Sequence, residues 1–321
     1  MIAVHAGAGY HEDDIEKLCA SALRESGFDI VRAVMILESD ARTNCGLGSN
    51  LTISGRVECE AAYMISQNLS FGAVAAVSNT ENPVFAAKKI VEEQIEKGSA
   101  SSLVQPMVLA GYGADRFVEN LGLQICANEE LVTDLASKDY EKALRNLAEM
   151  AKMRMDTVGA VSIEPSGLSK SCVSSGGILL KRDGRLGHSP QFGSAIWSEQ
   201  RGTKSISISV SGCGEALTRV HFAQNLAEKI LDWDDSNSLL MVLVRDFFEK
   251  HFRNSRLLEG FSSDRILAGG IVLFKDGSIN ELVVFHNTQH FAFACSNGKS
   301  IRRYKSSLPA GSALVCNSFG C

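Results

Sequence analysis

The spacing of apolar residues changes at Asp156-Thr157, and this change most constrains the fold of the 321-residue chain. Before it, apolar side chains in residues 139–154 recur at spacings of three and four, which predicts a helix. After it, residues 157–163 and residues 168–174 each show a strand pattern, in which apolar residues alternate with other residues. The turn Pro165-Ser166-Gly167 separates the two segments, which predicts a β-hairpin. We therefore expect a helical connection to lead directly into a strand at this peptide bond.

Strands followed by helices are expected in both halves of the chain. This order fits stacked sheets covered by helices better than a regular βαβ alternation. We find no internal repeat and no low-complexity linker. The expected strands are residues 2–9, 51–60, 71–77, 205–211, 269–274, 281–286 and 291–296, and the expected helices are residues 12–26, 29–40, 83–97, 215–230 and 238–252.

Composition narrows the class of protein. Hydrophobic residues make up 45% and charged residues 21%, which is ordinary for a globular chain. A net charge of −5 without a basic cluster argues against nucleic acid as a partner. Apolar runs fall far short of the roughly 20 residues that span a bilayer, so we expect no membrane insertion. We therefore expect the substrate to be a protein or a small molecule rather than nucleic acid or a membrane.

The cysteines and the start of the sequence bear on the compartment. The nine cysteines are scattered without a C-x-x-C pair, which favours a reducing compartment and no structural zinc. Residues 1–9 read as a strand, with no charged and apolar leader before them. We therefore expect a cytoplasmic or nuclear protein, although no basic run between Leu123 and Met155 offers a nuclear address.

Thr157 is the candidate nucleophile. A threonine hydroxyl reacts poorly unless an adjacent base takes its proton, and a free α-amine, with a pKa near 8, can be that base. An internal threonine has no such amine, so the bond between Asp156 and Thr157 would have to be cut. The same hydroxyl can do this by attacking the Asp156 carbonyl. Taken alone, Asp-Thr-Val-Gly is also a common start of a strand.

Three later segments could assist this chemistry. Ser175 lies near the end of the hairpin that Thr157 begins, so its hydroxyl could orient Thr157, although Ser-Ser-Gly-Gly is also a generic loop. The fork of Arg185 could hold a substrate carboxylate, or could simply lie at the surface. Ser211-Gly212 ends a strand and opens a helix, which presents a hydroxyl and backbone N–H groups to a developing oxyanion.

Together and in this order, the motifs resemble the threonine-nucleophile family of type 2 asparaginases, isoaspartyl peptidases, glycosylasparaginases and taspases, which are N-terminal-nucleophile hydrolases. The resemblance covers nearly the whole chain. It implies a four-layer αββα sandwich, one domain over residues 1–321 cut into residues 1–156 and 157–321, and a homodimer of such units. It also implies no cofactor and no catalytic metal. The motifs are His5-Ala6-Gly7-Ala8-Gly9-Tyr10-His11, residues 44–51, Glu58-Cys59-Glu60-Ala61 and the segments from Asp156 to Glu215 named above.

The resemblance also implies roles for individual residues. Thr157 is similar to the nucleophile, Ser175 to its supporting hydroxyl, and Ser211 with Gly212 to the oxyanion-binding pair. Asn44 resembles the asparagine that faces the nucleophile. The substrate-binding positions are those of Arg185 as the carboxylate clamp, His188, Gly214 and Gly7, although a tight-turn role is equally open for Gly7 and Asn44.

His188 departs from both branches of this family, so it bears on the substrate pocket rather than on the nucleophile. Asparaginases typically carry an aspartate here that pairs with the substrate ammonium, so its loss favours a substrate whose nitrogen lies in a peptide bond. The segments H-A-G-A-G-Y-H and S-G-C-G-E also resemble taspases. We therefore predict a threonine endopeptidase that cuts protein substrates after aspartate. The alternatives are an L-asparaginase or isoaspartyl dipeptidase of the same fold, and a binding protein that never matures.

Overall fold

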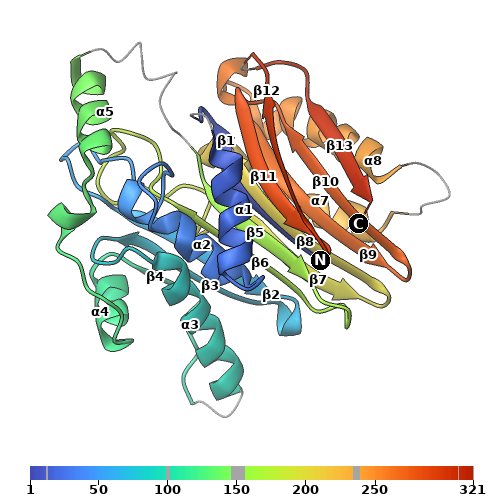
Figure 1. Ribbon diagram of the computed structural model, residues 1–321, viewed down its shortest axis with the longest axis horizontal. Coiled ribbons are helices and arrows are strands. Elements are labelled where there is room, and N and C mark those ends of the chain that lie inside the picture. Colours follow the sequence, from blue (N-terminus) through green and yellow to red (C-terminus); the bar gives the residue numbers. More distant parts are fainter. Residues whose placement is uncertain (12–13, 99–101, 146–155, 234–238, 310, 321) are drawn as a thin grey trace.

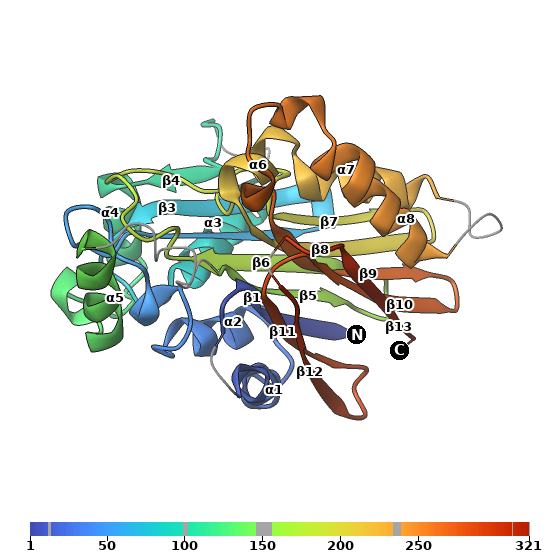
Figure 2. The same ribbon diagram turned by 90° about the horizontal axis from the view of Figure 1, so that it is seen from above.

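The computed structural model describes residues 1–321 apart from 12–13, 99–101, 146–155, 234–238, 310 and 321. Two β-sheets stack face to face, and helices cover their outer faces (Figure 1). Helices α1 and α2 lie on one outer side and α7 and α8 on the opposite side (Figure 2). This arrangement confirms the predicted αββα sandwich.

The larger sheet has the strand order β12-β11-β1-β5-β6-β2-β3-β4 and the smaller sheet the order β13-β10-β9-β8-β7. The larger sheet therefore mixes strands from before and after Thr157, with β1 inserted between β11 and β5, whereas all strands of the smaller sheet follow Thr157. The strands are β1 Ile2–Gly9, β2 Cys59–Ile65, β3 Ser70–Val77, β4 Val108–Ala110, β5 Val158–Ile163, β6 Ser169–Ser175, β7 Ile196–Arg201, β8 Lys204–Gly212, β9 Ala268–Asp276, β10 Ile279–His286, β11 His290–Ser296, β12 Ile301–Ser307 and β13 Val315–Gly320.

Amphipathic helices complete the layers. Apolar side chains of α1, α2 and α3 pack on the larger sheet, and those of α7 and α8 pack on the smaller one. The helices are α1 Ile15–Glu25, α2 Ile30–Glu38, α3 Pro83–Lys97, α4 Tyr112–Asn120, α5 Asp134–Arg145, α6 Gly214–Arg219, α7 Phe222–Leu231 and α8 Leu240–Phe247. Among the described residues, no helix is long and apolar enough to cross a membrane.

Strand β1 lies at the centre of the larger sheet, between β5 and β11. Because side chains alternate along a strand, Ile2 and Val4 face the helices while Ala3 faces the smaller sheet. The register against β11 shifts between His5 and Gly7, which is a β-bulge. Bulges re-aim the backbone that follows them, and this one directs Gly7 towards the start of β5.

Strand β8 carries a row of serines that faces the larger sheet. Its alternate residues Ile206 and Ile208 are buried in the core beneath α7. On the other face, Ser207 Oγ donates to Lys170 O (2.6 Å) and Ser209 Oγ lies 2.8 Å from His5 Nε2. These small polar side chains let the two sheets approach closely, and the row ends at Ser211, beside Thr157.

Three sequence-based expectations differ from the structure. Residues 51–60 do not form one strand, because a turn around Gly55 folds Leu51 against Val57 before β2 begins. The helix expected over residues 215–230 is divided into α6 and α7 by His221, whose φ is +43°. The helix expected over residues 139–154 begins earlier, at Asp134, and residues 146–155 lie outside the described part of the chain.

Candidate functional site

Thr157 directly precedes β5, and its hydrogen bonds reach Ser175 at the end of β6 and Ser211 near the end of β8. Its Oγ1 donates a hydrogen bond to Ser175 Oγ (3.1 Å), and its backbone N–H donates to Ser211 Oγ (3.1 Å). The Ser211 hydroxyl also accepts from the N–H of Ala8 (2.9 Å) and so ties β1 to the smaller sheet. Thr157 is 2% exposed, so the intact chain encloses its hydroxyl.

The carbonyl oxygen of Asp156, on the other side of the same peptide bond, is held by Asn44. Its Nδ2 donates to Asp156 O (3.0 Å) and to Gly177 O (2.8 Å), while its Oδ1 accepts from Asn50 N–H (2.9 Å). Ser211 and Gly212 were expected to bind the oxyanion. In this uncut chain Ser211 contacts the amide N–H instead, and Gly212 packs against the backbone of residues 267–268.

Gly7 packs against the peptide bond between Asp156 and Thr157. Its φ of +106° lies in the region that favours glycine. A Cβ added there would collide with the Asp156 Cβ and would stand 2.8 Å from Thr157 N. The bulge in β1 therefore brings bare backbone against this bond, where a side chain would displace it.

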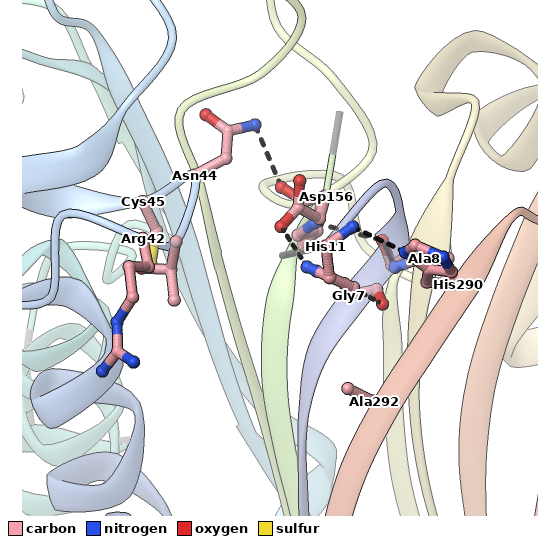
Figure 3. A network of polar contacts seen from close by, with 12 residues as sticks. Gly7, Ala8, His11, Arg42, Asn44, Cys45, Asp156, His290 and Ala292 are labelled. Atoms are coloured by element: carbon pink, nitrogen blue, oxygen red, sulfur yellow. Dashed lines mark hydrogen bonds and ion pairs between the residues drawn. The ribbon is translucent and has the colours of Figure 1, made fainter. Parts of the chain in front are cut away.

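His11, in the turn after β1, contacts both Gly7 and Asp156 (Figure 3). Its Nε2 lies 2.9 Å from Gly7 O, and its Nδ1 lies 3.3 Å from Asp156 Oδ2. Both side chains are buried, with 1% and 0% exposure. No role for His11 was predicted from the sequence. Its signal was that it is the second histidine of the segment from His5 to His11, but nothing in the sequence showed that this residue reaches Asp156.

Arg185, Gly214 and His188 form a second group beside the first. The Arg185 side chain is 15% exposed and makes a bidentate pair with Glu215, with Nε to Oε1 at 2.9 Å and Nη2 to Oε2 at 2.7 Å. A Cβ on Gly177, Gly187 or Gly214 would lie 3.1–3.3 Å from a guanidinium nitrogen. These three glycines therefore make the space in which Arg185 lies.

Gly177 links the two groups of site residues. Its N–H donates to Ser175 Oγ (3.0 Å), its carbonyl accepts from Asn44, and its Cα side faces Arg185. Ser175, expected to supply the supporting hydroxyl, and Arg185, expected to be the clamp, thus both contact Gly177. A substrate carboxylate at Arg185 would compete with Glu215, a partner that was not predicted from the sequence.

His188 is buried, and its Nε2 lies 3.0 Å from Val210 O. Burial lowers its pKa below the ordinary value, although the charge of Glu60 acts in the opposite direction. The ring is therefore neutral near pH 7 and supplies no negative charge beside Arg185. A buried carboxylate that acts on both His188 and Arg185, that of Glu60, accepts from the N–H of Gly187 (2.7 Å).

Lys181 is a buried cation that lies beside Gly177, as Arg185 does. Its Nζ donates to Glu58 O (2.5 Å) and lies 3.2 Å from the point where a Gly177 Cβ would stand. Burial lowers its pKa, while the charge of Glu60 raises it in part. The described residues contain no group of three or more histidine, cysteine or acidic side chains that could hold a metal ion.

An αββα sandwich with a hydroxyl residue at the start of a central strand, enclosed at the meeting point of two sheets, defines an N-terminal-nucleophile hydrolase. Comparison with known families agrees with this class, because the family model described as Asparaginase matches residues 15–239. The chain belongs to the Asparaginase family.

Individual relatives carry narrower names. The isoaspartyl peptidase/L-asparaginase of Danio rerio is 30% identical over 68% of this chain and 72% of its own length. That of Mus musculus is 33% identical over 60% of this chain and 56% of its own length. The isoaspartyl peptidase of Escherichia coli K12 is 31% identical over 63% of this chain and 62% of its own length. The predicted family is thus confirmed, whereas these names fit the alternative function better than the taspase branch.

Proposed function

We propose that the chain cuts itself between Asp156 and Thr157 and then uses Thr157 to hydrolyse amide bonds at aspartyl residues. The observation that supports this most is the set of contacts around one buried peptide bond. Asn44 holds its carbonyl oxygen, Ser211 its N–H, and Ser175 the neighbouring hydroxyl. Held geometry of this kind is what an intramolecular attack needs.

The self-cleavage step balances without a cofactor. Thr157 Oγ forms a bond to the carbonyl carbon of Asp156, the C–N bond breaks, and the hydroxyl proton ends on the α-nitrogen of Thr157. Water then hydrolyses the ester, leaving a new carboxylate on Asp156 and a free amine beside the Thr157 hydroxyl. During attack, Asn44 donates to the oxygen on which negative charge develops.

After cleavage, the same hydroxyl would act on other molecules. The α-amine of Thr157 takes the proton from Oγ, an acyl-enzyme forms, and water releases it. Arg185 would bind the substrate carboxylate in place of Glu215, by the same bidentate geometry. Ser211 with Gly212 remains our proposal for the oxyanion site of this second reaction, once the Thr157 N–H has become an amine.

The printed names of the relatives support isoaspartyl peptidase and L-asparaginase activity as the first candidate. Such substrates present a free ammonium group beside their carboxylate. Glu60 and Glu215 are the carboxylates near Arg185 that could offset this charge. On this proposal, the products are aspartate and ammonia, or aspartate and an amino acid.

His188 favours a second candidate, an endopeptidase that cuts after aspartate. A neutral, buried ring at this position gives a substrate ammonium no partner. An aspartate within a polypeptide has no such charge, because its nitrogen is part of an amide. Protein substrates, a homodimer of cut chains and a cytoplasmic or nuclear location all remain proposals.

The test is a substrate panel given to the self-cleaved protein. Asparagine, a β-aspartyl dipeptide and an aspartate-containing peptide are compared, with Thr157→Ala as the blank for each. Ammonia or free aspartate supports the first candidate, and peptide cleavage after aspartate supports the second. A self-cleaved protein that turns over none of the three would overturn both, and a chain that never cuts itself would support the binding protein.

A further inference from the structure

The proposed self-cleavage does not yet involve the contact between His11 and Asp156. His11 Nε2 lies 2.9 Å from Gly7 O, and His11 Nδ1 lies 3.3 Å from Asp156 Oδ2 (Figure 3). The ring therefore lies between the backbone that packs on the scissile bond and the side chain of the residue before that bond. Both contacts are buried from solvent.

The geometry fixes where the protons are. A carbonyl oxygen only accepts hydrogen bonds, so Nε2 carries a hydrogen towards Gly7 O. In a neutral ring, Nδ1 would then present a lone pair to a carboxylate oxygen of Asp156, and two acceptors repel. The contact thus requires one more proton, either on Nδ1 or on the carboxyl group. His11 and Asp156 share that proton.

The backbone of His11 is also held in place. Its N–H donates to His290 Nδ1 (2.9 Å), and its carbonyl accepts from Lys305 Nζ (3.3 Å). The Tyr10 and His290 rings lie 5.4 Å apart. Strands β11 and β12 therefore anchor the turn that carries His11, and the imidazole cannot leave Asp156 without breaking its own contact to Gly7.

We propose that His11 is a positioning residue for self-cleavage, and that the proton it shares with Asp156 fixes the residue whose carbonyl Thr157 attacks. This inference rests on the proposed self-cleavage. Asn44 holds the carbonyl of Asp156 and His11 holds its side chain, so the residue is fixed at two points. A misplacement of about 1 Å can slow such a reaction on the order of 100-fold.

The test compares two amide variants of the full-length chain. Asparagine places its Nδ2 near the position of histidine Nδ1, so His11→Asn keeps a permanent donor towards Asp156. Glutamine places its Nε2 near the position of histidine Nε2, so His11→Gln keeps the Gly7 contact alone. His251→Gln, at an exposed histidine on the far side of the smaller sheet, is the matched control. The yield of fragments that begin at Thr157 is followed over time at pH 7.

We expect His11→Gln to cleave on the order of 10- to 100-fold more slowly than wild type at pH 7, because Asp156 is no longer held. His11→Asn should cleave faster than His11→Gln, because its Nδ2 still donates to Asp156. The control should match wild type in rate. Each variant is first shown to fold by its circular dichroism and thermal unfolding.

Other outcomes separate this inference from the proposed function. If wild type cleaves through Thr157 while His11→Gln matches it, or His11→Asn is no faster than His11→Gln, only the role of His11 is wrong. If wild type stays whole, the proposed function fails and this inference fails with it.

Discussion

Gly7 shows at the scale of one residue how closely β1 packs on the peptide bond between Asp156 and Thr157. Its positive φ and the absence of a Cβ let β1 lie against these two residues. The sequence pointed to a glycine-rich turn here, and left open whether the glycine serves the turn or the site. In the structure the positive φ and the close approach belong to the same residue, and a role of Gly7 in the site remains a prediction.

Gly7→Ala should therefore abolish self-cleavage. The methyl group would push the scissile bond away from Asn44 and Ser175, and the strained φ would cost about 1–3 kcal/mol of stability. Gly298→Ala is the matched control, because Gly298 also has a positive φ (+89°) but has open space where its Cβ would stand. Both variants are followed by fragment yield and thermal unfolding. Normal self-cleavage by Gly7→Ala would show that the close packing is not needed.

His188→Asp should shift substrate preference towards asparagine and β-aspartyl dipeptides, away from aspartate within a peptide. The new carboxylate would pair with a substrate ammonium, and one good charged hydrogen bond contributes about 1.5–3 kcal/mol, roughly 10- to 150-fold in preference. The control is His188→Asn, because asparagine has the same shape as aspartate but no charge. The measurement is the ratio of kcat/KM for the two kinds of substrate. Equal ratios in the two variants would remove position 188 as the determinant.

At the scale of elements, the sequence predicted the helices and strands whose apolar residues recur along the whole element. Helix α3 begins at Pro83 and ends at Lys97 as expected, and the hairpin of β5 and β6 is in place. Edge strands were missed because their residues show no alternation: β12 carries Arg302, Arg303 and Lys305. Only its pairing with β11 makes this segment a strand.

The candidate site follows the same rule. Residues with chemistry of their own, such as Thr157 and Arg185, could be found in the sequence. Their partners could not, because His11 lies 145 residues before Asp156 and Glu215 lies 30 residues after Arg185. An acidic residue or a histidine has no local pattern that shows its partner, and the sheet order that brings them together is a property of the whole fold.

Glu38 makes one junction between elements sensitive to pH. Located at the end of α2, it accepts from Val84 N–H (3.0 Å) at the start of α3. Burial raises its pKa to about 8. Because the folded state binds this proton more tightly than the unfolded state, Glu38 contributes stability below its unfolded value near 4.5, and that contribution is lost as pH rises through about 8.

Glu38→Gln should remove this dependence while keeping the acceptor for Val84. Relative to the variant, wild type should lose several kcal/mol of unfolding free energy between pH 5 and 9, at about 1.4 kcal/mol per pKa unit. Urea unfolding of both proteins at each pH gives the difference. Parallel stability curves would mean that Glu38 is charged in the folded protein.

At the scale of the whole molecule, the proposed cut would not divide the fold. Strand β1 pairs with β5 and β11, and β2 pairs with β6, so segments from before and after Thr157 interleave in one sheet. Residues 1–156 and 157–321 should therefore stay together after cleavage. The change would be local, because the enclosed Thr157 would gain a free amine.

The most direct test of the account is the mass and N-terminal sequence of the purified protein, measured beside Thr157→Ala. We predict that wild type yields two fragments under denaturing conditions, one of them beginning at Thr157, and that both elute together under native conditions. Thr157→Ala should remain one chain of 34.6 kDa. Self-cleavage in Thr157→Ala, or a wild-type chain that stays whole, would contradict the central claim that Thr157 cuts its own peptide bond.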